Sequence, residues 1–572
     1  MVEKEDISTG GEPGISNKQT WWKEAIVYQL YPRSFKDSND DGIGDIRGII
    51  SRLDYLQSLG INVVWLNPVF SSPNDDMGYD VSDYRNIMTE MGTMDDFEEL
   101  LKGLHQRGIK LIADLVLNHT SDEHEWFVRS KSSRSDPFRN FYHWWPAEKG
   151  IPPKRSSVFH EEGAWTYDEQ TDSYYLHYFS RRQPDLNWEN PAVRKEMYAI
   201  MKFWLDKGVD GFRLDAFTFI SKENGYPEIP EQYKDDYFSY YSSGPRLHDY
   251  LQEMNREVFC KYDLMTVGEA SGITSGQALL FTGSERKELQ TLYHFDHANW
   301  GRKTTSLYYP DENNRKLSDL KKIFTSWNTA FENDGWGAVY FTTHDQSRMV
   351  SRFGNDTTYR KESSKLLFTF LLSMRATPYI YQGDEISMRN IRFENITDYR
   401  DLHTINYYNH LAASGGDVQA FLTAQKEVAR DNSRTPFQWS TKKNAGFTNG
   451  TPWINVNPDY DTINMESAEK DTGSTLHYVR EMIALRKSLP VFVYGDYTLM
   501  EEESETLFIY TRRLEDTRVL VALNFSDHQN PLTLPADFTL VKVLINNYPG
   551  VNNEINNKVT LQPWQAIILE YK

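Results

Sequence analysis

Eight apolar stretches of strand length recur along the chain, and segments with the pattern of amphipathic helices separate them. Several helical segments end at a glycine, as at Gly60, Gly108 and Gly208, which is typical of a helix C-terminus. Repeated βα units predict a parallel sheet, and eight of them predict a closed (β/α)8 TIM barrel with its active site at the C-terminal strand ends. An open doubly wound sheet is the rival fold, but no glycine-rich phosphate loop follows the first strand. The expected strands are residues 25–31, 61–66, 109–116, 209–216, 264–270, 292–296, 338–345 and 377–384.

Two parts of the chain depart from this rhythm. Residues 119–186 are rich in Arg, Ser, Trp, Tyr and Pro without a repeating unit, and a connection of this length predicts an inserted subdomain after the third strand. Short apolar strands separated by turns predict a C-terminal antiparallel β-sandwich domain over residues 491–572. The barrel would then comprise residues 20–118 and 187–490, and the polar residues 1–19 would form a flexible tail.

The overall composition restricts the classes of partner. A formal charge of -20 over 572 residues disfavours nucleic acid and anionic membranes, so a small neutral substrate fits better. No stretch reaches the ~18 apolar residues of a membrane helix, and the charged N-terminus lacks the apolar core of a signal peptide. Cys260 is the only cysteine, so no intrachain disulfide can form, which fits a reducing compartment. We expect a cytoplasmic monomer.

The segment at residues 209–216 reads Val-Asp-Gly-Phe-Arg-Leu-Asp-Ala and predicts a buried strand that ends in an acid. A carboxylate at the tip of a buried strand is costly unless it is paired. Arg213 lies two residues before Asp215 and therefore points to the same face of the strand. It can keep Asp215 ionised, as a carboxylate nucleophile requires. The alternative is an ion pair that only locks the strand to a helix.

Acids end three of the expected strands: Asp215 the fourth, Glu269 the fifth and Asp345 the seventh. In a barrel these strand ends meet at one mouth, where crowding of like charges raises at least one pKa. Glycosidic cleavage with retention of configuration needs one carboxylate to attack the anomeric carbon and a second, protonated acid to donate to the leaving oxygen, the two about 5–5.5 Å apart. A third acid can favour the oxocarbenium-like transition state.

The chain contains five separated motifs: DLVLNH at residues 114–119, QPDLNW at 183–188, GFRLDA at 211–216, VGE at 267–269 and HDQ at 344–346. Together they resemble the motifs of the α-amylase family of glycoside hydrolases, and within it the group of oligo-1,6-glucosidases, α-glucosidases and sucrose isomerases. The resemblance spans residues 20–572. It implies that Asp215 is the nucleophile, Glu269 the general acid/base and Asp345 the group that stabilises the transition state, while Arg213 orients Asp215.

The same resemblance implies which side chains bind the terminal nonreducing glucose. His119 and His344 would hydrogen-bond its hydroxyl groups, and Tyr79 would stack under its ring. Asp80 would bond further hydroxyls and pair with Arg430. Because this pair closes the end of the pocket, the enzyme would act only from chain termini. No organic cofactor is implied.

Further residues of the pocket follow from the resemblance. Phe159 and Phe179 match aromatic residues that the inserted subdomain contributes to the lining, and Gln183 lies in a matched motif and is assigned to substrate binding. The position of Ala216 often distinguishes linkages in this group: Val typically accompanies α-1,6 bonds, and Ala or Thr accompanies α-1,4 bonds or broader sets. We therefore expect a retaining, exo-acting α-glucosidase that hydrolyses several short α-glucosides of the isomaltose, maltose and sucrose type.

Sucrose isomerases and transglucosylases are the near alternative. The aromatic residue that sucrose isomerases usually carry two positions after the acid/base is absent, because Ala270 and Ser271 follow here. Their Arg/Asp-rich product-control segment is unrecognisable near residues 297–302, although residues 375–378 and 436–439 do resemble them. Hydrolysis is therefore favoured. A remote alternative is a noncatalytic relative, like the heavy chains of amino-acid transporters, but those have a membrane helix and lack the three acids.

An acidic loop follows the first expected strand. Residues 37–45 read Asp-Ser-Asn-Asp-Asp-Gly-Ile-Gly-Asp and place oxygen ligands at alternate positions, as a Ca²⁺ loop does. Gly48 stands where an EF-hand carries its bidentate glutamate, so the loop is not an EF-hand. The resemblance implies a structural Ca²⁺ here, and a solvated acidic turn is the alternative. The ligands would be the side chains of Asp37, Asn39, Asp41 and Asp45 and the carbonyl of Ile43.

Overall fold

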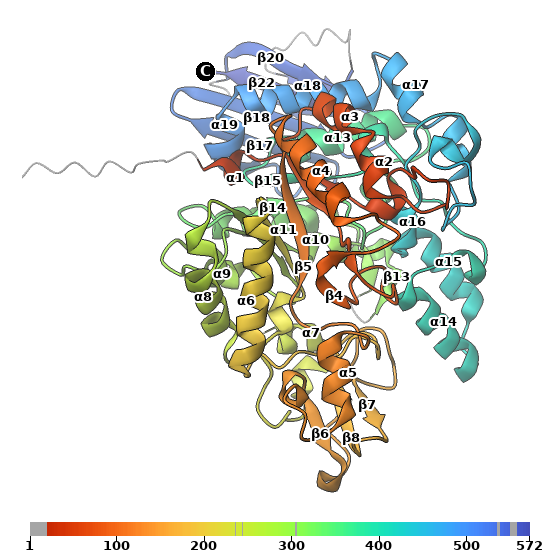
Figure 1. Ribbon diagram of the computed structural model, residues 1–572. Helices are drawn as coiled ribbons and strands as arrows, with labels where there is room; N and C mark the ends of the chain where they lie inside the picture. Colours follow the sequence, from red (N-terminus) through yellow and green to blue (C-terminus); the bar gives the residue numbers. More distant parts are fainter. Residues whose placement is uncertain (1–19, 235, 243, 304–305, 535–537, 549–557) are drawn as a thin grey trace, which may run out of the picture.

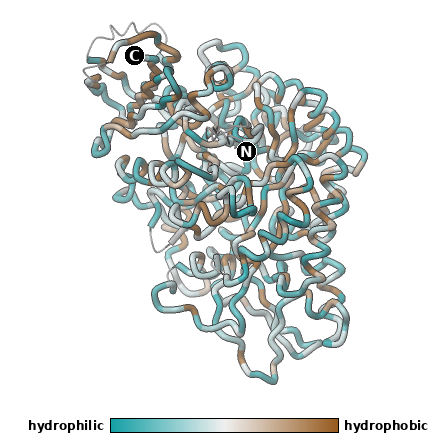
Figure 2. Tube along the Cα trace, turned by 90° about the vertical axis from the view of Figure 1, so that its left-hand side faces the viewer, coloured by the Kyte–Doolittle hydropathy of each residue, from teal (hydrophilic) through white to brown (hydrophobic). Residues whose placement is uncertain are grey.

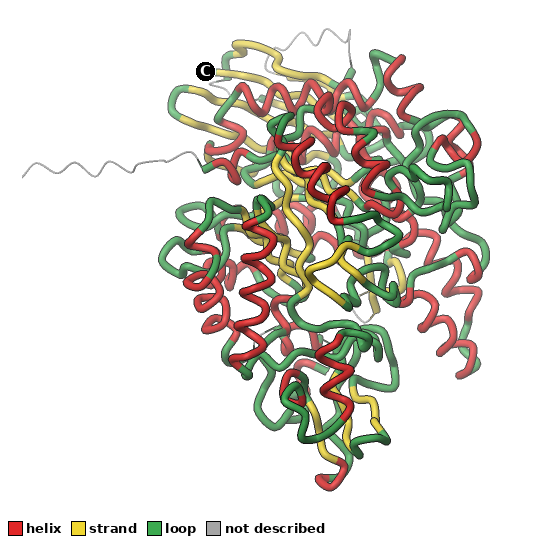
Figure 3. The backbone as a smooth tube through the Cα atoms, viewed as in Figure 1, coloured by secondary structure: helices red, strands yellow, loops and turns green. Residues whose placement is uncertain are grey.

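The computed structural model describes residues 20–572 except 235, 243, 304–305, 535–537 and 549–557. The tail expected over residues 1–19 lies outside the described residues. Strands run through the centre of the molecule and helices surround them, as Figure 3 shows. The inserted subdomain projects at one end of the molecule, and the C-terminal strands pack at the opposite end (Figure 1).

The expected barrel is confirmed. Eight parallel strands pair in the order β11-β10-β9-β5-β2-β1-β15-β14, and a parallel bridge between Leu292 and Gly337 joins the two ends into a ring. Val27 lies in register with Val63 on one side and Tyr379 on the other. The strands are β1 (Val27–Leu30), β2 (Val63–Leu66), β5 (Lys110–Val116), β9 (Gly211–Asp215), β10 (Met265–Ala270), β11 (Thr291–His294), β14 (Ala338–Val339) and β15 (Thr377–Tyr381).

The seventh strand is much shorter than the expected residues 338–345. β14 ends at Val339, and the chain then leaves the ladder. The Tyr340 hydroxyl donates to the carbonyl of His294 at 2.9 Å, so a side chain rather than the backbone ties this segment to β11. Asp345 consequently lies on a loop after the strand and not at its tip.

Local capping signals set the helix boundaries. The sequence pattern Thr-x-x-Asp at residues 93–96 resembles a capping box, and the structure confirms one at α4. The Asp96 amide donates to Thr93 Oγ1 at 3.2 Å, and the Thr93 amide donates to Asp96 Oδ2 at 2.8 Å. Asn190 caps α6, and Pro191 occupies its first turn. The apolar period over residues 47–59 predicts a helix, but the structure divides this segment into two, α2 (Ile46–Ile50) and α3 (Leu53–Leu59). The longer helices are α3 (Leu53–Leu59), α4 (Met94–His105), α5 (Glu125–Ser132), α6 (Pro191–Asp206), α8 (Leu247–Glu257), α11 (Leu317–Ala330), α13 (Arg360–Ser373), α14 (Leu402–Ser414), α15 (Val418–Val428) and α18 (Thr475–Ser488).

Shorter elements decorate the barrel. The short helices are α1 (Trp21–Glu24), α2 (Ile46–Ile50), α7 (Tyr237–Tyr241), α9 (Ala278–Thr282), α10 (Asp296–Asn299), α12 (Met349–Phe353), α16 (Asp431–Arg434), α17 (Met465–Lys470) and α19 (Val491–Tyr494). The inserted subdomain contains α5 and a three-stranded antiparallel sheet, and bridges from His119 to Asp185 and from Tyr142 to Leu186 join its ends. The strands outside the barrel and the C-terminal domain are β3 (Phe70–Ser71), β4 (Asp83–Ile87), β6 (Trp144–Pro146), β7 (Trp165–Asp168), β8 (Ser173–Leu176), β12 (Arg302–Lys303) and β13 (Ser306–Pro310).

The C-terminal domain consists of antiparallel sheets, as expected. A five-stranded sheet has the order β16-β17-β18-β22-β20, and β19 pairs with β21 beside it. Its strands include hydrophobic segments, which are brown near the label C in Figure 2. Among the described residues, no helix has both the length and the apolar character required to cross a membrane. The strands are β16 (Asp496–Met500), β17 (Leu507–Leu514), β18 (Thr517–Asn524), β19 (Asn530–Thr533), β20 (Leu540–Asn546), β21 (Lys558–Leu561) and β22 (Ala566–Tyr571).

A buried arginine ties the C-terminal domain to the barrel. Arg512, on β17, is fully buried and donates to the carbonyl of Ser373 at the end of α13, to that of Phe492 at 3.0 Å and to that of Gly495 at 2.8 Å. Among the described residues no carboxylate pairs with this guanidinium, and burial lowers the pKa of Arg512 to about 9. Its charge is therefore stabilised by carbonyl dipoles, including the negative end of the α13 dipole.

We predict that Arg512→Met lowers the melting temperature, because several buried carbonyls lose their donor, at a cost of about 3 kcal/mol. Differential scanning calorimetry measures the shift. The control is Arg513→Met, because Arg513 is exposed at the next position of the same strand. Equal melting temperatures for the two variants would contradict the anchoring role.

Candidate active site

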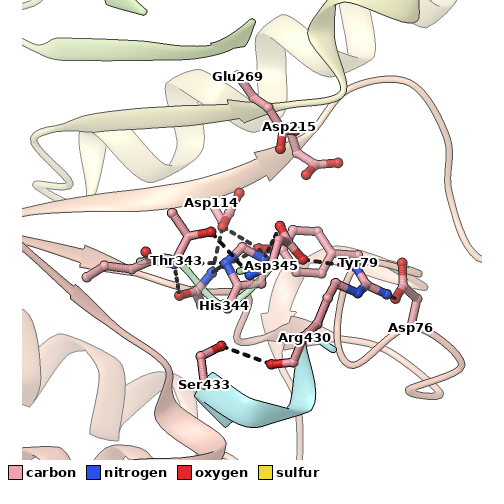
Figure 4. Close-up of polar contacts among 12 residues, drawn as sticks. Asp76, Tyr79, Asp114, Asp215, Glu269, Thr343, His344, Asp345, Arg430 and Ser433 are labelled. Atoms are coloured by element: carbon pink, nitrogen blue, oxygen red, sulfur yellow. Dashed lines mark hydrogen bonds and ion pairs between the residues drawn. The ribbon is translucent and has the colours of Figure 1, made fainter. Parts of the chain in front are cut away.

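One guanidinium holds together the acids at the C-terminal ends of neighbouring strands. Arg213, on β9, is fully buried, and its Nη1 donates to Asp114 Oδ1 at 2.8 Å and to Asp215 Oδ1. Its Nη2 lies 2.6 Å from Glu269 Oε1 on β10, and the Tyr293 hydroxyl accepts from Nε at 3.1 Å and from Nη2 at 2.8 Å. The expected ion pair of Arg213 and Asp215 is therefore part of a wider cluster that also places Glu269 beside Asp215 (Figure 4).

The cluster creates opposing effects on the two neighbouring carboxyl groups. Burial raises the pKa of Asp215, Arg213 lowers it, and Glu269 raises it again. Burial likewise raises the pKa of Glu269, Arg213 opposes this, and Asp345 adds to the rise. One cation shared by three acids cannot neutralise them all, so the arrangement favours retaining a proton on one carboxyl group while another stays ionised. This is the division of states that a nucleophile and a general acid require.

The third acid lies across the site, in a cationic environment. Asp345 Oδ1 accepts from Arg430 Nη1 at 2.9 Å and from Arg434 Nη2 at 3.2 Å, and its Oδ2 lies 3.1 Å from His344 Nε2. Burial raises the pKa of Asp345, but His344, Arg430 and Arg434 outweigh it, so the pKa lies below the usual range. Asp345 is therefore an ionised carboxylate opposite Asp215, placed to balance positive charge in the site (Figure 4).

Tyr79 and His344 form a rigid aromatic pair beside these acids. Their rings stack with centroids 5.2 Å apart and planes 7° apart. The Tyr79 hydroxyl donates to Asp114 Oδ2 at 2.9 Å and lies 2.6 Å from His344 Nε2. Burial lowers the pKa of His344 to about 3, so this imidazole is neutral near pH 7. Tyr79 and His344, both predicted to bind glucose, therefore lie in the site, and Asp114 connects Tyr79 to Arg213.

A second group of polar side chains comes from the loops after β2 and β5 and from the subdomain. His119 packs on Phe179 with ring centroids 4.9 Å apart. Gln183 Nε2 lies 3.2 Å from His119 Nε2 and donates to Asp76 Oδ2 at 3.1 Å. Burial lowers the pKa of His119 to about 3. The structure therefore brings together three residues predicted to bind substrate and adds Asp76, which the sequence reasoning missed.

The predicted pairing of Arg430 with Asp80 is wrong. Asp80 is fully buried and accepts from Ser72 Oγ at 2.9 Å, from the Asp75 amide at 2.8 Å and from the Asp76 amide at 3.0 Å. It therefore organises its own loop. The acid of this loop that faces Arg430 is Asp76, with Oδ1 3.8 Å from Nη2, and Figure 4 shows the two side by side.

Asp76 rather than Asp80 faces Arg430 because the chain reverses direction between the two acids. Met77 and Gly78 both have positive φ, +49° and +101°, so the loop turns between Asp76 and Asp80. The sequence offers three aspartates within six positions, and only a prediction of this left-handed turn could have distinguished the inward-facing acid from the one that caps the loop.

Phe159 lies next to Arg430, whereas Ala216 lies next to Asp215 and Glu269. The Phe159 ring lies 5.9 Å from Phe179 and 5.4 Å from the Arg430 guanidinium, so it is next to the arginine expected to close the pocket. Ala216 follows the predicted nucleophile with a left-handed φ of +48°, and its amide donates to Glu269 Oε2 at 3.1 Å. This backbone hydrogen bond fixes the predicted acid/base relative to β9.

Several residues of the site carried no individual assignment at the sequence level. Asp114 and Tyr293 complete the shell around Arg213, and Arg434 contacts both Asp345 Oδ1 at 3.2 Å and the carbonyl of His344 at 2.8 Å. Asp114 opens the DLVLNH motif, which is a signal that could have identified it. Tyr293 and Arg434 lie in segments without such a signal.

The acidic loop of residues 37–45 uses its oxygens to accept its own amides. Asp37 Oδ1 accepts from the amides of Asn39 at 2.9 Å and Asp40 at 2.8 Å, and Asp45 Oδ2 accepts from the Ser38 amide at 2.8 Å. Among the described residues, no three His, Cys, Asp or Glu side chains converge on a metal position. The oxygen ligands fit the chemistry of a hard cation, so calcium at this loop stays a prediction.

Comparisons with known proteins agree with this architecture. Residues 29–495 match the family described as "Alpha amylase, catalytic domain", and residues 507–568 match "Alpha-amylase SusG C-terminal domain". The chain is 50% identical to an oligo-1,6-glucosidase of Parageobacillus thermoglucosidasius, over 97% of this chain and 100% of that protein. It is 41% identical to a trehalose-6-phosphate hydrolase of Bacillus subtilis, over 97% of this chain and 99% of that protein.

Solved structures give the same result. An isomaltulose synthase of Klebsiella sp. LX3 superimposes with a TM-score of 0.95 at 42% identity, over 97% of this chain and 100% of that chain. The family matches together extend across the barrel and the C-terminal sheets. The chain therefore belongs to the α-amylase family of glycoside hydrolases.

Proposed function

We propose that the protein is a retaining, exo-acting α-glucosidase that removes the terminal nonreducing glucosyl residue of short oligosaccharides and disaccharides. The observation that carries this proposal is the Arg213 guanidinium, which bonds Asp215 and Glu269 on adjacent strands while Asp345 lies across the same site. The oligo-1,6-glucosidase and α-glucosidase names of full-length relatives support it.

The proposed reaction uses double displacement. Asp215 attacks the anomeric carbon, and Glu269 donates its proton to the leaving oxygen, which gives a glycosyl-enzyme. Glu269 then accepts a proton from water, which hydrolyses the intermediate and restores Asp215. Asp345, whose pKa lies below the usual range despite its burial, supplies negative charge opposite the oxocarbenium-like transition state.

The exo preference is proposed from the end of the site where Arg430 lies. Asp76, Asp345 and Phe159 all contact or approach its guanidinium, and Gln183 connects Asp76 to His119. Charged and amide groups packed in this way suit the hydroxyls of one terminal sugar, because each buried polar group needs a partner. We propose that these groups exclude a longer chain on that side.

Sucrose isomerisation is the second candidate, because the protein resembles isomaltulose synthases throughout its fold. We favour hydrolysis because Ala270 and Ser271 follow the predicted acid/base in place of the usual aromatic residue. We also propose a monomeric protein, a small neutral substrate and a cytoplasmic location, the last because Cys260 is an exposed, unpaired thiol.

A substrate panel tests the proposal. We predict that the protein releases glucose from isomaltose, maltose and sucrose, with glucose and fructose as the main products from sucrose, measured by chromatography. Isomaltulose or trehalulose as the main product would establish the isomerase alternative, and inactivity on every α-glucoside would refute the proposal.

The variant Ala216→Val tests the linkage preference within the same panel. It should shift the ratio of kcat/KM values toward isomaltose. It should also lower the free energy of unfolding by roughly 1–2 kcal/mol, because a β-branched residue at a left-handed φ is strained. A lower melting temperature would show this loss. An unchanged ratio would refute the role of this position.

The pH profile tests the roles of the paired carboxyl groups. Because burial and Asp345 raise the pKa of Glu269, this residue retains its proton above the usual pH range of a glutamate. We therefore predict that kcat/KM falls as the pH rises through this raised pKa, since the deprotonated form cannot act as an acid. In Glu269→Gln, kcat for maltose should fall by roughly 10²–10⁴-fold, and the alkaline limb should vanish with 4-nitrophenyl α-glucoside. Glu288→Gln, a change at a buried glutamate outside the site, should retain that limb.

The calcium proposal has a separate test. The side chains of Asp37, Asn39, Asp41 and Asp45 and the Ile43 carbonyl would hold a structural Ca²⁺ that stabilises the loop without entering the reaction. We predict that EDTA lowers the melting temperature and that added Ca²⁺ restores it, because an ion bound by the native state stabilises that state. Asp41→Ala should abolish this response, whereas Asp95→Ala, a change at an exposed acid outside the loop, should preserve it. A melting temperature unaffected by EDTA and by Ca²⁺ would end the proposal.

A further inference from the structure

We infer that Asp401 is a positioning residue for the reaction, because it holds the Arg430 guanidinium at the orientation in which that group reaches Asp345. Asp401 lies immediately before α14, the first helix of the hairpin formed by α14 and α15. The hairpin projects beside the barrel in Figure 1. The inference rests on the proposed function, since it assigns a role within the same site.

The Arg430 side chain is divided between two aspartates. Its Nε and Nη2 both donate to Asp401 Oδ1, at 3.1 Å and 2.5 Å, while its Nη1 donates to Asp345 Oδ1 at 2.9 Å. Asp76 lies farther from Nη2, at 3.8 Å, and the guanidinium lies over the Phe159 ring. Because a guanidinium is planar, fixing one edge on Asp401 also fixes the direction of Nη1.

Asp401 is itself held rigidly. It caps α14, with Oδ1 accepting from the His403 amide at 3.2 Å and Oδ2 accepting from the Thr404 amide at 3.3 Å and from Thr404 Oγ1 at 2.9 Å. Its own amide donates to Asp431 Oδ2 at 2.9 Å. The carboxylate therefore cannot rotate without breaking the start of the helix, so the position of Arg430 depends on the position of α14.

The charge of Asp401 also balances the arginines behind Asp345. Arg434 Nη1 lies 3.9 Å from Asp401 Oδ1, so this carboxylate faces both Arg430 and Arg434, with His403 and Asp431 as the other titratable neighbours. Burial raises the pKa of Asp401, but the two arginines outweigh it and hold the pKa well below the usual range. Without this negative charge, Asp345 would balance more of the charge of both guanidinium groups, and they would weaken the electrostatic stabilisation that Asp345 gives the sugar.

Neutralisation of Asp401 without loss of the helix cap provides the test. Asp401→Asn keeps a side chain that caps helices well and removes the charge. We predict that kcat/KM for the most active disaccharide falls by about 30-fold or more, the scale expected when one partner of a buried charge pair is lost. We also predict that glucose raises the melting temperature of the parent protein but not that of Asp401→Asn. This measurement of binding does not depend on turnover.

Asp417→Asn is the matched control. Asp417 caps α15 of the same hairpin by accepting from the amides of Gln419 at 3.1 Å and Ala420 at 2.9 Å. Both contacts are to backbone amides, and neither involves an arginine. Asp417→Asn should preserve both kcat/KM and the effect of glucose on the melting temperature. Equal losses in the two variants would overturn the inference.

A double-mutant cycle separates positioning from general damage. In an Arg430→Gln background, Asp401→Asn should change kcat/KM by less than about 3-fold, because residues that act through one contact are not additive. A merely structural role for Asp401 predicts the same fall in both backgrounds, and that result would refute the inference.

A second variant covers the case in which Asp401→Asn does not fold. Asp401→Glu keeps the charge but displaces the carboxylate by one methylene, so a folded protein with unchanged kcat/KM would overturn the claim that position matters. A parent protein that hydrolyses no α-glucoside would refute the proposed function instead, and the glucose-binding comparison would still decide the role of Asp401.

Discussion

The site depends on the burial of one cation among several anions. Arg213 has no access to solvent, and Asp114, Asp215, Glu269 and the Tyr293 hydroxyl surround it and stabilise its charge. A buried charge left without partners is strongly unfavourable, so the folded protein must place these acids together. The need to pair this buried charge therefore also brings the carboxyl groups of Asp215 and Glu269 together, because both contact the same guanidinium from adjacent strands.

On the side of the site where Asp345 lies, buried charges are also paired, but the ratio of cations to anions is different. There, Arg430 and Arg434 face Asp345 and Asp401, so cations and anions alternate. Arg213 shares one cation among several acids, and the pKa values of Asp215 and Glu269 rise. Asp345 has two guanidinium neighbours, and its pKa falls. Protonated and ionised acids can thus coexist in one small site because each wall has its own ratio of charges.

The sequence predicted the elements of this fold and site that depend on local patterns. The barrel strands, the capping box at Thr93 and the acids near the strand ends carry signals within a few residues. Asp80 was wrongly paired with Arg430 because a left-handed turn at Met77 and Gly78 decides which aspartate of the loop faces this arginine. The side-chain types alone do not predict that turn. Tyr293, Arg434 and Asp401 act through neighbours that are far away in the chain, so no local pattern identifies them.

The early end of β14 has a consequence for how such an enzyme can diversify. Asp215 and Glu269 lie within the last two residues of strands whose ladders fix them relative to each other, whereas Asp345 comes after a two-residue strand and is placed by side chains. In the proposed mechanism the sheet thus positions the nucleophile and the acid/base, while the residue that stabilises the transition state is positioned separately. On this proposal, substitutions around α16, which Arg430 precedes and Arg434 ends, would change the surroundings of the sugar without disturbing the strands that carry the two reacting carboxyl groups.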